Sequence, residues 1–250
     1  MKYTRLLLPA LFLVLTAISC KKLEEPAPPA EGSLTISLNH VFGNDTTTWD
    51  MSKEYTVPQT GDKLTFTSFK YYVSNIKLQR TDSTWWAMPE SYFLVDAQKT
   101  ETSTINVHHV PGNTYIAVSY TMGIDSARNV SGSHTNALSS YNGMYWDENK
   151  GFIMLKAEGY SINSTDGTFA FDLGGFSGSN SVVTQKIVAF GKDVPIGNGS
   201  NPTMALSAKV SSLWATAPSV NIRKSIKTPS AEAKTMAMDF YNSITMTSIK

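Results

Sequence analysis

Residues 64–78 read LTFTSFKYYVSNIKL, and this stretch decides the fold class. Successive side chains of a β-strand point to opposite faces, so a strand with one buried face has an apolar residue at every second position. Here the apolar positions change phase twice, from Leu64 and Phe66 to Phe69, Tyr71 and Val73, and then to Ile76 and Leu78. A strict period of two allows this only if the strand is bulged or broken. We therefore expect one bulge near Ser68 and another near Ser74 and Asn75.

The same alternation recurs elsewhere and predicts an all-β protein. The first strand has an apolar face made of Leu34, Ile36, Leu38, His40 and Phe42. Further short strands are expected at residues 92–96, 104–107, 114–120, 151–157, 168–173, 182–190 and 204–210. Turn residues separate them, for example Pro111-Gly112 and Asp166-Gly167. Many short strands with regular turns are typical of an antiparallel β-sandwich.

One helix is expected near the C-terminus. Ser230 can cap its first turn, and apolar residues recur at helical spacing at Ala233, Met236, Ala237, Phe240 and Ile244. This pattern predicts a short helix that closes one end of the sandwich. Residues 123–149 show little strand character, and a loop of this length inside a compact domain is usually functional or closed on itself.

The N-terminus has the features of a bacterial export signal. Lys2 and Arg5 precede an apolar segment, residues 6–18, that is too short to span a bilayer. Small residues then lead to Cys20, the only cysteine of the chain. This position is that of the lipid-modified residue of a bacterial lipoprotein. The membrane is therefore an expected partner, and the expected location is the outer membrane, at the cell surface or on the periplasmic face.

These features divide the chain into three parts. Residues 1–20 are a lipoprotein signal peptide, residues 21–31 a proline-containing, charged and flexible tether, and residues 32–250 one domain. The net charge is +1 and the basic residues are scattered, so no nucleic acid partner is expected. With Cys20 acylated, the domain has no thiol for a disulfide or a metal site.

The most distinctive pattern of the chain lies in residues 123–159. This segment resembles the central signature of the MbnP-like proteins, a family of exported copper-binding β-proteins. The positions that match in register are Gly123, Asp125, Ser126, Asn129, Ala137, Leu138, Gly143, Met144, Tyr145, Trp146, Asn149, Gly151, Ile153, Lys156, Glu158 and Gly159. The resemblance covers nearly all of the mature chain. It implies that the chain binds copper or a related metal ion, as a carrier or scavenger.

Copper sites without cysteine need imidazole nitrogen, supplemented by other donors. His40 coincides with the first-strand histidine of the family, and it lies on an apolar face where an imidazole must find a hydrogen-bond partner or a metal. His40 is therefore either the primary metal ligand or a satisfied core residue. His108 and His109 are adjacent, so at most one of them joins a site. His134 is expected to be a solvent-exposed loop residue with some chance of recruitment.

Trp146 and Asp172 complete the metal site that the resemblance implies. In MbnP-like proteins a dihaem partner enzyme oxidises a tryptophan to kynurenine, whose aromatic amine can bind copper. An intact indole nitrogen has no lone pair for a metal, so Trp146 is either a ligand after oxidation or a buried anchor of its loop. Asp172 stands where the family often has a histidine. It either moves the site toward harder ions or simply faces solvent.

An oxygen-rich group surrounds the signature, made of Asp125, Asn129, Asp147, Glu148 and Glu158. Asp and Asn in turns usually accept hydrogen bonds from local backbone donors, and this is the main interpretation of Asp125 and Asn129. A calcium site is the alternative. Asp125, His134 and Glu148 are accordingly the possible additional binding residues. Glu148 stands where the family has a second tryptophan.

No catalytic motif supports an enzyme. The chain has no G-x-S-x-G elbow, no H-E-x-x-H pattern and no phosphate-binding glycine loop. We therefore expect a binding protein. The alternative to a metal carrier is a surface binding module for a glycan or peptide, because Trp49, Trp85 and Trp86 lie in polar stretches and are expected to be exposed.

Overall fold

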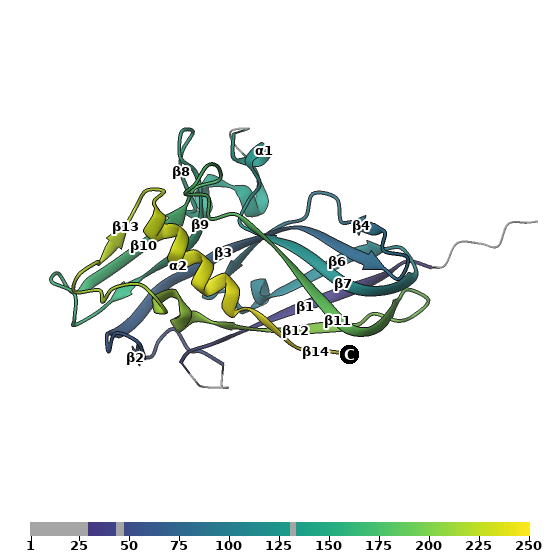
Figure 1. Ribbon diagram of the computed structural model, residues 1–250, viewed down its shortest axis with the longest axis horizontal. Helices are drawn as coiled ribbons and strands as arrows, with labels where there is room; N and C mark the ends of the chain where they lie inside the picture. Colours follow the sequence, from purple (N-terminus) through teal and green to yellow (C-terminus); the bar gives the residue numbers. More distant parts are fainter. Residues whose placement is uncertain (1–29, 44–47, 131–133) are drawn as a thin grey trace, which may run out of the picture.

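The computed structural model describes residues 30–43, 48–130 and 134–250. The predicted signal peptide, Cys20 and nearly all of the predicted tether lie outside these residues. The described chain forms an elongated sandwich of two sheets with one helix laid across it (Figure 1). None of the described helices is long and apolar enough to cross a membrane.

The smaller sheet has the strand order β14-β12-β1-β6. Its strands are β1 (Gly32–Val41), β6 (Thr104–Val110), β12 (Thr203–Lys209) and β14 (Thr245–Ile249). The alternation predicted for the first strand is confirmed, because Leu34, Ile36, Leu38 and His40 are all buried. The apolar face of β1 therefore turns toward the other sheet, and it takes His40 into the core.

The larger sheet has the order β11-β7-β3-β9-β10-β13. Its strands are β3 (Lys63–Arg80), β7 (Asn113–Met122), β9 (Gly151–Tyr160), β10 (Thr168–Gly174), β11 (Thr184–Ile196) and β13 (Ser225–Ile226). Three short strands pair with β3, namely β2 (Tyr55–Thr56), β4 (Trp85–Ala87) and β5 (Tyr92–Asp96), and β8 (Tyr145–Asp147) pairs with β9. The β-sandwich is confirmed, and its sheets are mixed because β1 pairs with β12, and β10 with β13, in parallel.

The central strand β3 contains both predicted bulges. Its pairing with β9 shifts register between Phe66 and Ser68, and its pairing with β7 shifts between Ser74 and Lys77. Asn75, inside the second shift, has a left-handed φ of 52°. The bulges change which residues face the core, so one long strand buries apolar residues of both phases.

Strands β7 and β9 lie along the same edge of β3, one after the other. Lys70 pairs with β9 on one side and β5 on the other, whereas Val73 pairs with β7 opposite the same β5. The two strands separate at Tyr72, whose carbonyl accepts a hydrogen bond of 2.9 Å from the Gly123 N–H. The signature loop that joins β7 to β9 starts from this gap. It contains α1 (Ser126–Asn129), η2 (Asn136–Leu138), η3 (Ser140–Asn142) and β8, and it projects from the sheet (Figure 1).

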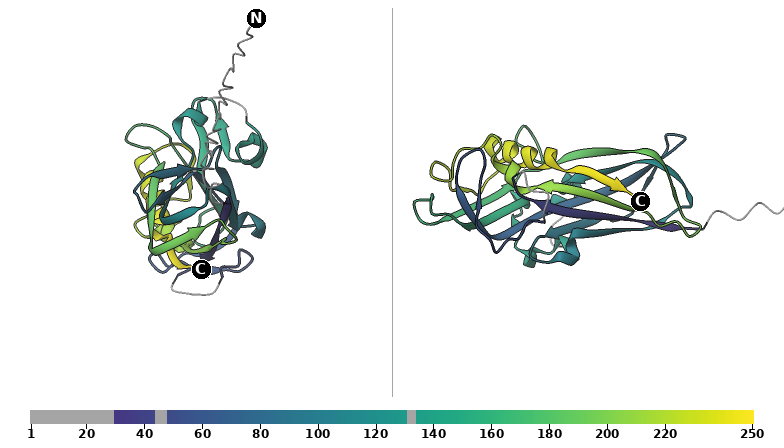
Figure 2. Two further views of the ribbon diagram at one scale, coloured as in Figure 1. Left: turned by 90° about the vertical axis from the view of Figure 1, so that its right-hand side faces the viewer. Right: turned by 90° about the horizontal axis from the view of Figure 1, so that it is seen from below.

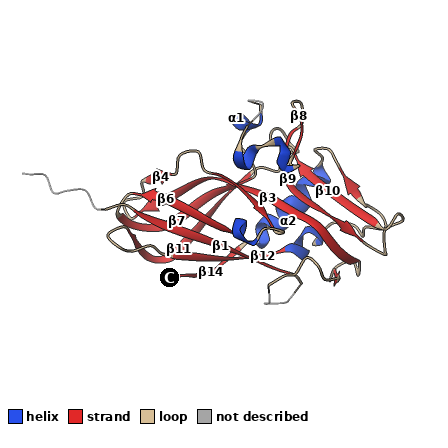
Figure 3. Cartoon of the chain, turned by 180° about the vertical axis from the view of Figure 1, so that it is seen from behind, coloured by secondary structure: helices blue, strands red, loops and turns tan. Residues whose placement is uncertain are grey.

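The predicted C-terminal helix is confirmed as α2 (Ala231–Ser243). The Ser230 hydroxyl accepts a hydrogen bond of 3.0 Å from the Ala233 N–H and so caps the first turn. Its apolar face is buried against β10, β12 and the short helix η4 (Val210–Trp214). Another short helix, η1 (Thr100–Ser103), follows β5. Figures 2 and 3 show strands along the whole molecule and α2 laid along one side of it.

Candidate functional site

His40 points from β1 into the space between the sheets. Its Nε2 atom lies 3.0 Å from the Tyr71 hydroxyl on β3, and the two groups form a buried hydrogen bond. Burial lowers the pKa of the His40 imidazole to about 4, because the charged form would lose its hydration. At neutral pH this side chain is therefore an uncharged imidazole.

Aromatic rings form the walls around His40. The ring centroids of Tyr71, Phe69 and Trp49 lie 5.7, 5.9 and 6.4 Å from that of His40. Trp49 is only 7% exposed, because its backbone N–H donates a hydrogen bond of 2.7 Å to the His40 carbonyl and so brings residue 49 back against β1. The expectation that Trp49 is exposed was therefore wrong. We call this set, His40, Trp49, Phe69 and Tyr71, the His40 chamber.

Two further tyrosines place hydroxyl groups in the core close to the chamber. Tyr120 on β7 and Tyr241 on α2 are buried, and their hydroxyls have no hydrogen-bond partner among the described residues. The pKa of the Tyr71 hydroxyl is raised well above its usual value by burial and then by Tyr120 and Tyr241. The polar groups of this region are thus uncharged phenols and one uncharged imidazole.

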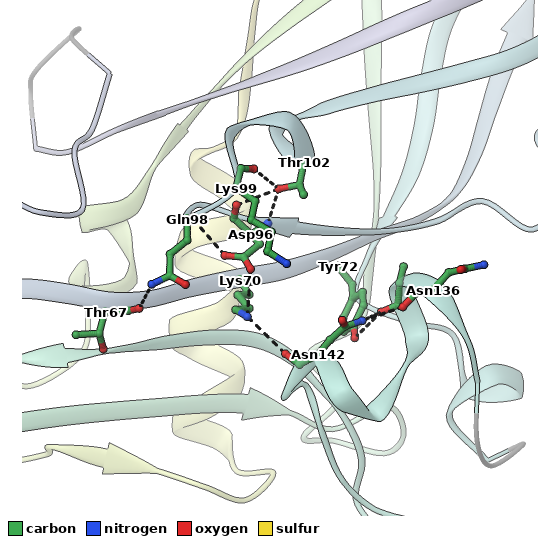
Figure 4. A network of polar contacts seen from close by, with 10 residues as sticks. Thr67, Lys70, Tyr72, Asp96, Gln98, Lys99, Thr102, Asn136 and Asn142 are labelled. Carbon is green, nitrogen blue, oxygen red and sulfur yellow. Dashed lines mark hydrogen bonds and ion pairs between the residues drawn. The ribbon is translucent and has the colours of Figure 1, made fainter.

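The opposite face of the larger sheet carries charges. Asp96, Lys70, Lys156 and Asp172 are cross-strand neighbours on β5, β3, β9 and β10. Lys70 forms an ion pair of 3.1 Å with Asp96 (Figure 4), and Lys156 forms one of 2.8 Å with Asp172. Lys156 is also 3.0 Å from Glu158. We call Asp96, Lys70, Lys156 and Asp172 the charged row.

Asp172 lies within this row and not in solvent. It is 7% exposed, so the interpretation that it simply faces solvent was wrong. Burial alone would lower the pKa of the Lys156 ammonium, but its contacts with Asp172 and Glu158 raise it. Lys156 therefore stays protonated and occupies the side of Asp172 that a metal ion would need.

The structure does not bring His40 and Asp172 together. Tyr71, which contacts His40, and Lys70, which belongs to the charged row, are consecutive residues of β3 and point to opposite faces. In the part of the chain that the structure describes, no group of three or more His, Cys, Asp or Glu side chains could hold a metal ion.

Trp146 lies on the same side of β10 as Asp172. Its ring covers Gly174, where a Cβ atom would come within 2.5 Å of the indole, and Lys150 Nζ lies 5.8 Å from the ring centroid. Gly174 is two residues beyond Asp172, so both positions face the same way along β10. Trp146 is partly buried and fastens β8 to the sheet.

Asp125 is the N-cap of α1. Its carboxylate accepts hydrogen bonds from the Arg128 N–H (3.3 Å), from the Asn75 amide (3.0 Å) and from the Tyr92 hydroxyl (2.6 Å). Asp125 thus satisfies local donors, as its position in a turn predicts. Glu148 is exposed in the turn between β8 and β9.

The remaining histidines lie outside the His40 chamber. His134 Nε2 is 2.9 Å from the Arg128 carbonyl and its ring is 6.0 Å from that of Phe152, so this partly buried side chain is not the solvent-exposed residue we expected. His108 and His109 are both exposed on β6, and His109 Nδ1 lies 3.0 Å from Glu31.

Comparison with known proteins agrees with this fold. The model of the MbnP family matches residues 31–237. This chain belongs to the MbnP family. The solved structure of MbnP from Methylosinus trichosporium is similar, with a TM-score of 0.50 and 10% identity, covering 74% of this chain and 78% of that chain. No curated protein matches the chain.

Residues of the MbnP signature hold the two ends of the signature loop together. The Asn129 amide donates to the carbonyls of Ile124 (2.7 Å) and Asp125 (3.0 Å), and its oxygen accepts from the Phe152 N–H (3.0 Å). A Cβ atom on Gly151 would approach the Asn129 oxygen to 2.6 Å. The side chain of Asn129 thus ties the start of the loop to the start of β9.

A second glycine of the MbnP signature permits close strand packing. A Cβ atom on Gly159 would lie 2.1 Å from the Thr65 carbonyl, so only glycine fits where β9 pairs with Phe66 of β3. The sequence placed the signature residues near a site. It did not predict two contacts, that of Lys156 with Asp172 and that of Trp49 with His40. Alternation of apolar residues gave no signal for either, because both depend on contacts between distant segments.

Proposed function

We propose that this member of the MbnP family is an exported binding protein that carries or scavenges a metal ion, with copper the first candidate. The observation that carries the proposal is the His40 chamber. An imidazole whose pKa is about 4 keeps a lone pair free of protons at neutral pH, and imidazole is a preferred ligand for copper. His40 is therefore the primary ligand in this proposal.

In this proposal Trp146 fastens β8 to the sheet and Asp172 pairs with Lys156, and neither joins the metal site. Lys156 competes with any cation for the Asp172 carboxylate, and Trp146 packs on Gly174 on the face away from His40. The three hydrogen bonds of Asp125 likewise leave little reason to place calcium there.

Trp49 takes the place that Trp146 had in the sequence-based interpretation. If a dihaem partner enzyme oxidises a tryptophan of this chain to supply a ligand next to His40, the chamber geometry favours Trp49. Mass spectrometry of the protein purified from its native envelope tests this point. Oxidation confined to a peptide with Trp49 supports the assignment, whereas oxidation confined to Trp146 contradicts it.

Location and attachment complete the proposal. The protein acts without catalysis in the cell envelope, held to the outer membrane through a lipid on Cys20, which lies outside the described residues. Labelling with a radioactive fatty acid, lost in Cys20→Ala, tests the anchor.

The metal proposal is tested by titrating metal-free protein with Cu(I) and Cu(II). We expect one copper ion per chain, and at least about 100-fold weaker binding in His40→Ala, since loss of groups that only support a ligand already costs 10–100-fold. His108→Ala, at an exposed position on β6, is the matched control and keeps wild-type affinity. If Asp172→Ala weakens binding and His40→Ala does not, the site lies on the charged face instead.

The titration can also reveal a family member that has lost metal binding. In that case wild-type protein binds no copper, and Asp172→His, which restores the family residue, creates binding.

A surface binding module for a glycan is the second candidate. The observation in its favour is Trp85, which is 38% exposed on the edge strand β4 beside Trp86. Exposed aromatic rings stack on sugars. Loss of glycan binding in the double variant Trp85→Ala, Trp86→Ala, with copper affinity intact, would support this function.

A further inference from the structure

A pocket of about 410 Å³ lies beside the charged row, between the β5–η1 segment and the two short helices η2 and η3 of the signature loop. The residues that matter for its chemistry are Lys70, Asp96, Lys99, Asn136, Tyr141 and Asn142. The volume is within the range of about 300–1,000 Å³ that is usual for small-molecule sites. No residue predicted from the sequence to be functional lines this pocket.

Hydrogen bonds fix one wall of the pocket. Asp96 holds Lys70 by the ion pair of 3.1 Å, and the Asp96 N–H donates a bond of 2.8 Å to the Thr102 hydroxyl (Figure 4). That hydroxyl in turn has one hydrogen to share between the carbonyls of Asp96 (2.9 Å) and Lys99 (2.7 Å). Contacts within the chain therefore hold the β5–η1 segment in place.

The opposite wall is fixed in the same way. The Asn142 amide donates bonds of 2.9 Å to the carbonyls of Asn136 and Ala137, and the Asn142 carbonyl accepts one of 3.5 Å from Lys70. Lys70 thus joins both walls. A site held in place before binding loses less entropy when a ligand enters.

Several groups at the pocket have no partner among the described residues. Within the described residues, the Lys99 ammonium makes no ion pair, the Asn136 side-chain amide makes no hydrogen bond, and Tyr141 is 99% exposed. Lys70 is neutralised by Asp96, so Lys99 leaves the pocket with one uncompensated positive charge. The free groups are therefore one cation, one amide that can donate and accept, and one flat aromatic ring.

We propose that this pocket binds an acidic sugar, a residue with one carboxylate and several hydroxyls. The carboxylate pairs with Lys99, and the sugar ring stacks on Tyr141. The inference goes beyond the proposed metal binding and does not depend on it. The pocket is also distinct from the exposed surface at Trp85, because Trp85 lies on β4 and Tyr141 lies on η3.

The test uses calorimetry of the full-length protein with trigalacturonate and with its methyl ester. We expect the acid to bind and the ester to bind about two- to fivefold more weakly, as loss of one partly exposed ion pair predicts. Lys99→Gln should remove this preference without changing the ester affinity. Lys192→Gln, at another exposed lysine, is the matched control and keeps it. Tyr141→Ala should weaken both ligands about tenfold.

Four outcomes would overturn the proposal. The first is absence of trigalacturonate binding by the wild type. The second is equal effects of Lys99→Gln and Lys192→Gln, and the third is loss of binding in Trp85→Ala, Trp86→Ala with Tyr141→Ala unaffected. Binding of a glutamate-rich peptide to Lys99 in place of the sugar would also contradict it. His40→Ala leaves sugar affinity unchanged, so failure here is distinct from failure of the metal proposal.

Discussion

The two faces of the larger sheet solve the problem of buried polar groups in opposite ways. The His40 chamber removes charge, because burial keeps the imidazole neutral and the tyrosines protonated. The charged row keeps its charges and pairs them, Lys70 with Asp96 and Lys156 with Asp172. The contrast teaches that candidate ligands implied by one family resemblance, such as His40 and Asp172, can be separated by the thickness of one sheet. A neutral imidazole, hydrogen-bonded to Tyr71, lies on one face, while the carboxylates of the row are paired with lysines on the other.

Breaking the charged row should have the largest effect on stability. Lys156→Ala leaves the buried Asp172 carboxylate with no partner, and we expect a loss of about 3–5 kcal/mol in the free energy of unfolding. Urea denaturation measures it. Lys224→Ala is the matched control, because its ion pair with Asp166 is exposed to solvent and should contribute less than about 1 kcal/mol. A similar cost for both lysines would show that the row is not a buried pair.

The double variant Lys156→Met, Asp172→Leu sharpens this prediction. Replacing a buried ion pair by apolar residues of similar size is often neutral or stabilising. We therefore expect the double variant to regain most of the stability that Lys156→Ala loses.

The second-largest effect on stability is a dependence on pH, which the His40 chamber predicts. Burial lowers the His40 pKa from 6.5 to about 4, so between these values the unfolded chain binds a proton that the folded chain does not. The stability contribution is therefore complete above about pH 6.5 and is lost as the pH falls toward 4, by up to about 3 kcal/mol. Urea unfolding at pH 7.5, 5.5 and 4.5 measures it. In His40→Gln the total loss of stability between pH 7.5 and 4.5 should be smaller by about this amount, and an unchanged loss would contradict a buried, neutral imidazole.

The loop cap should have the smallest effect of the three. Asp125→Ala removes the N-cap of α1 together with the acceptor of Asn75 and Tyr92, and we expect a loss of about 1–2 kcal/mol. Asp125→Asn keeps an oxygen acceptor and should lose less. Thermal unfolding separates the two variants. An equal loss in both would mean that the charge of Asp125, and not its capping bond, fastens the loop.

Local patterns predicted much of the fold. Two phase changes in residues 64–78 located both bulges of β3, and Ser230 with its apolar repeat located α2. These features depend on neighbouring residues, so the sequence carries them directly. The parallel pairing of β1 with β12 was not predicted, because it joins segments far apart in the chain. β8 was missed because three residues are too few to show alternation.

The site was harder to predict for the same physical reason. The inward direction of His40 followed from its phase in β1, and the capping role of Asp125 followed from its turn. The partner of Asp172 and the burial of Trp49 depend on strand register and on how residue 49 returns to β1. No local pattern encodes either contact.

In the proposed function, the metal ion binds in the His40 chamber and not on the charged face. Long-range proton–nitrogen NMR spectra of the histidine rings, recorded while Cu(I) is added, test it directly. Binding in the chamber predicts that one ring-nitrogen resonance of His40 shifts with stoichiometric copper, while those of His108, His109 and His134 stay in place. A shift confined to His134, or to the Trp146 indole, would place the metal outside the His40 chamber and contradict this assignment.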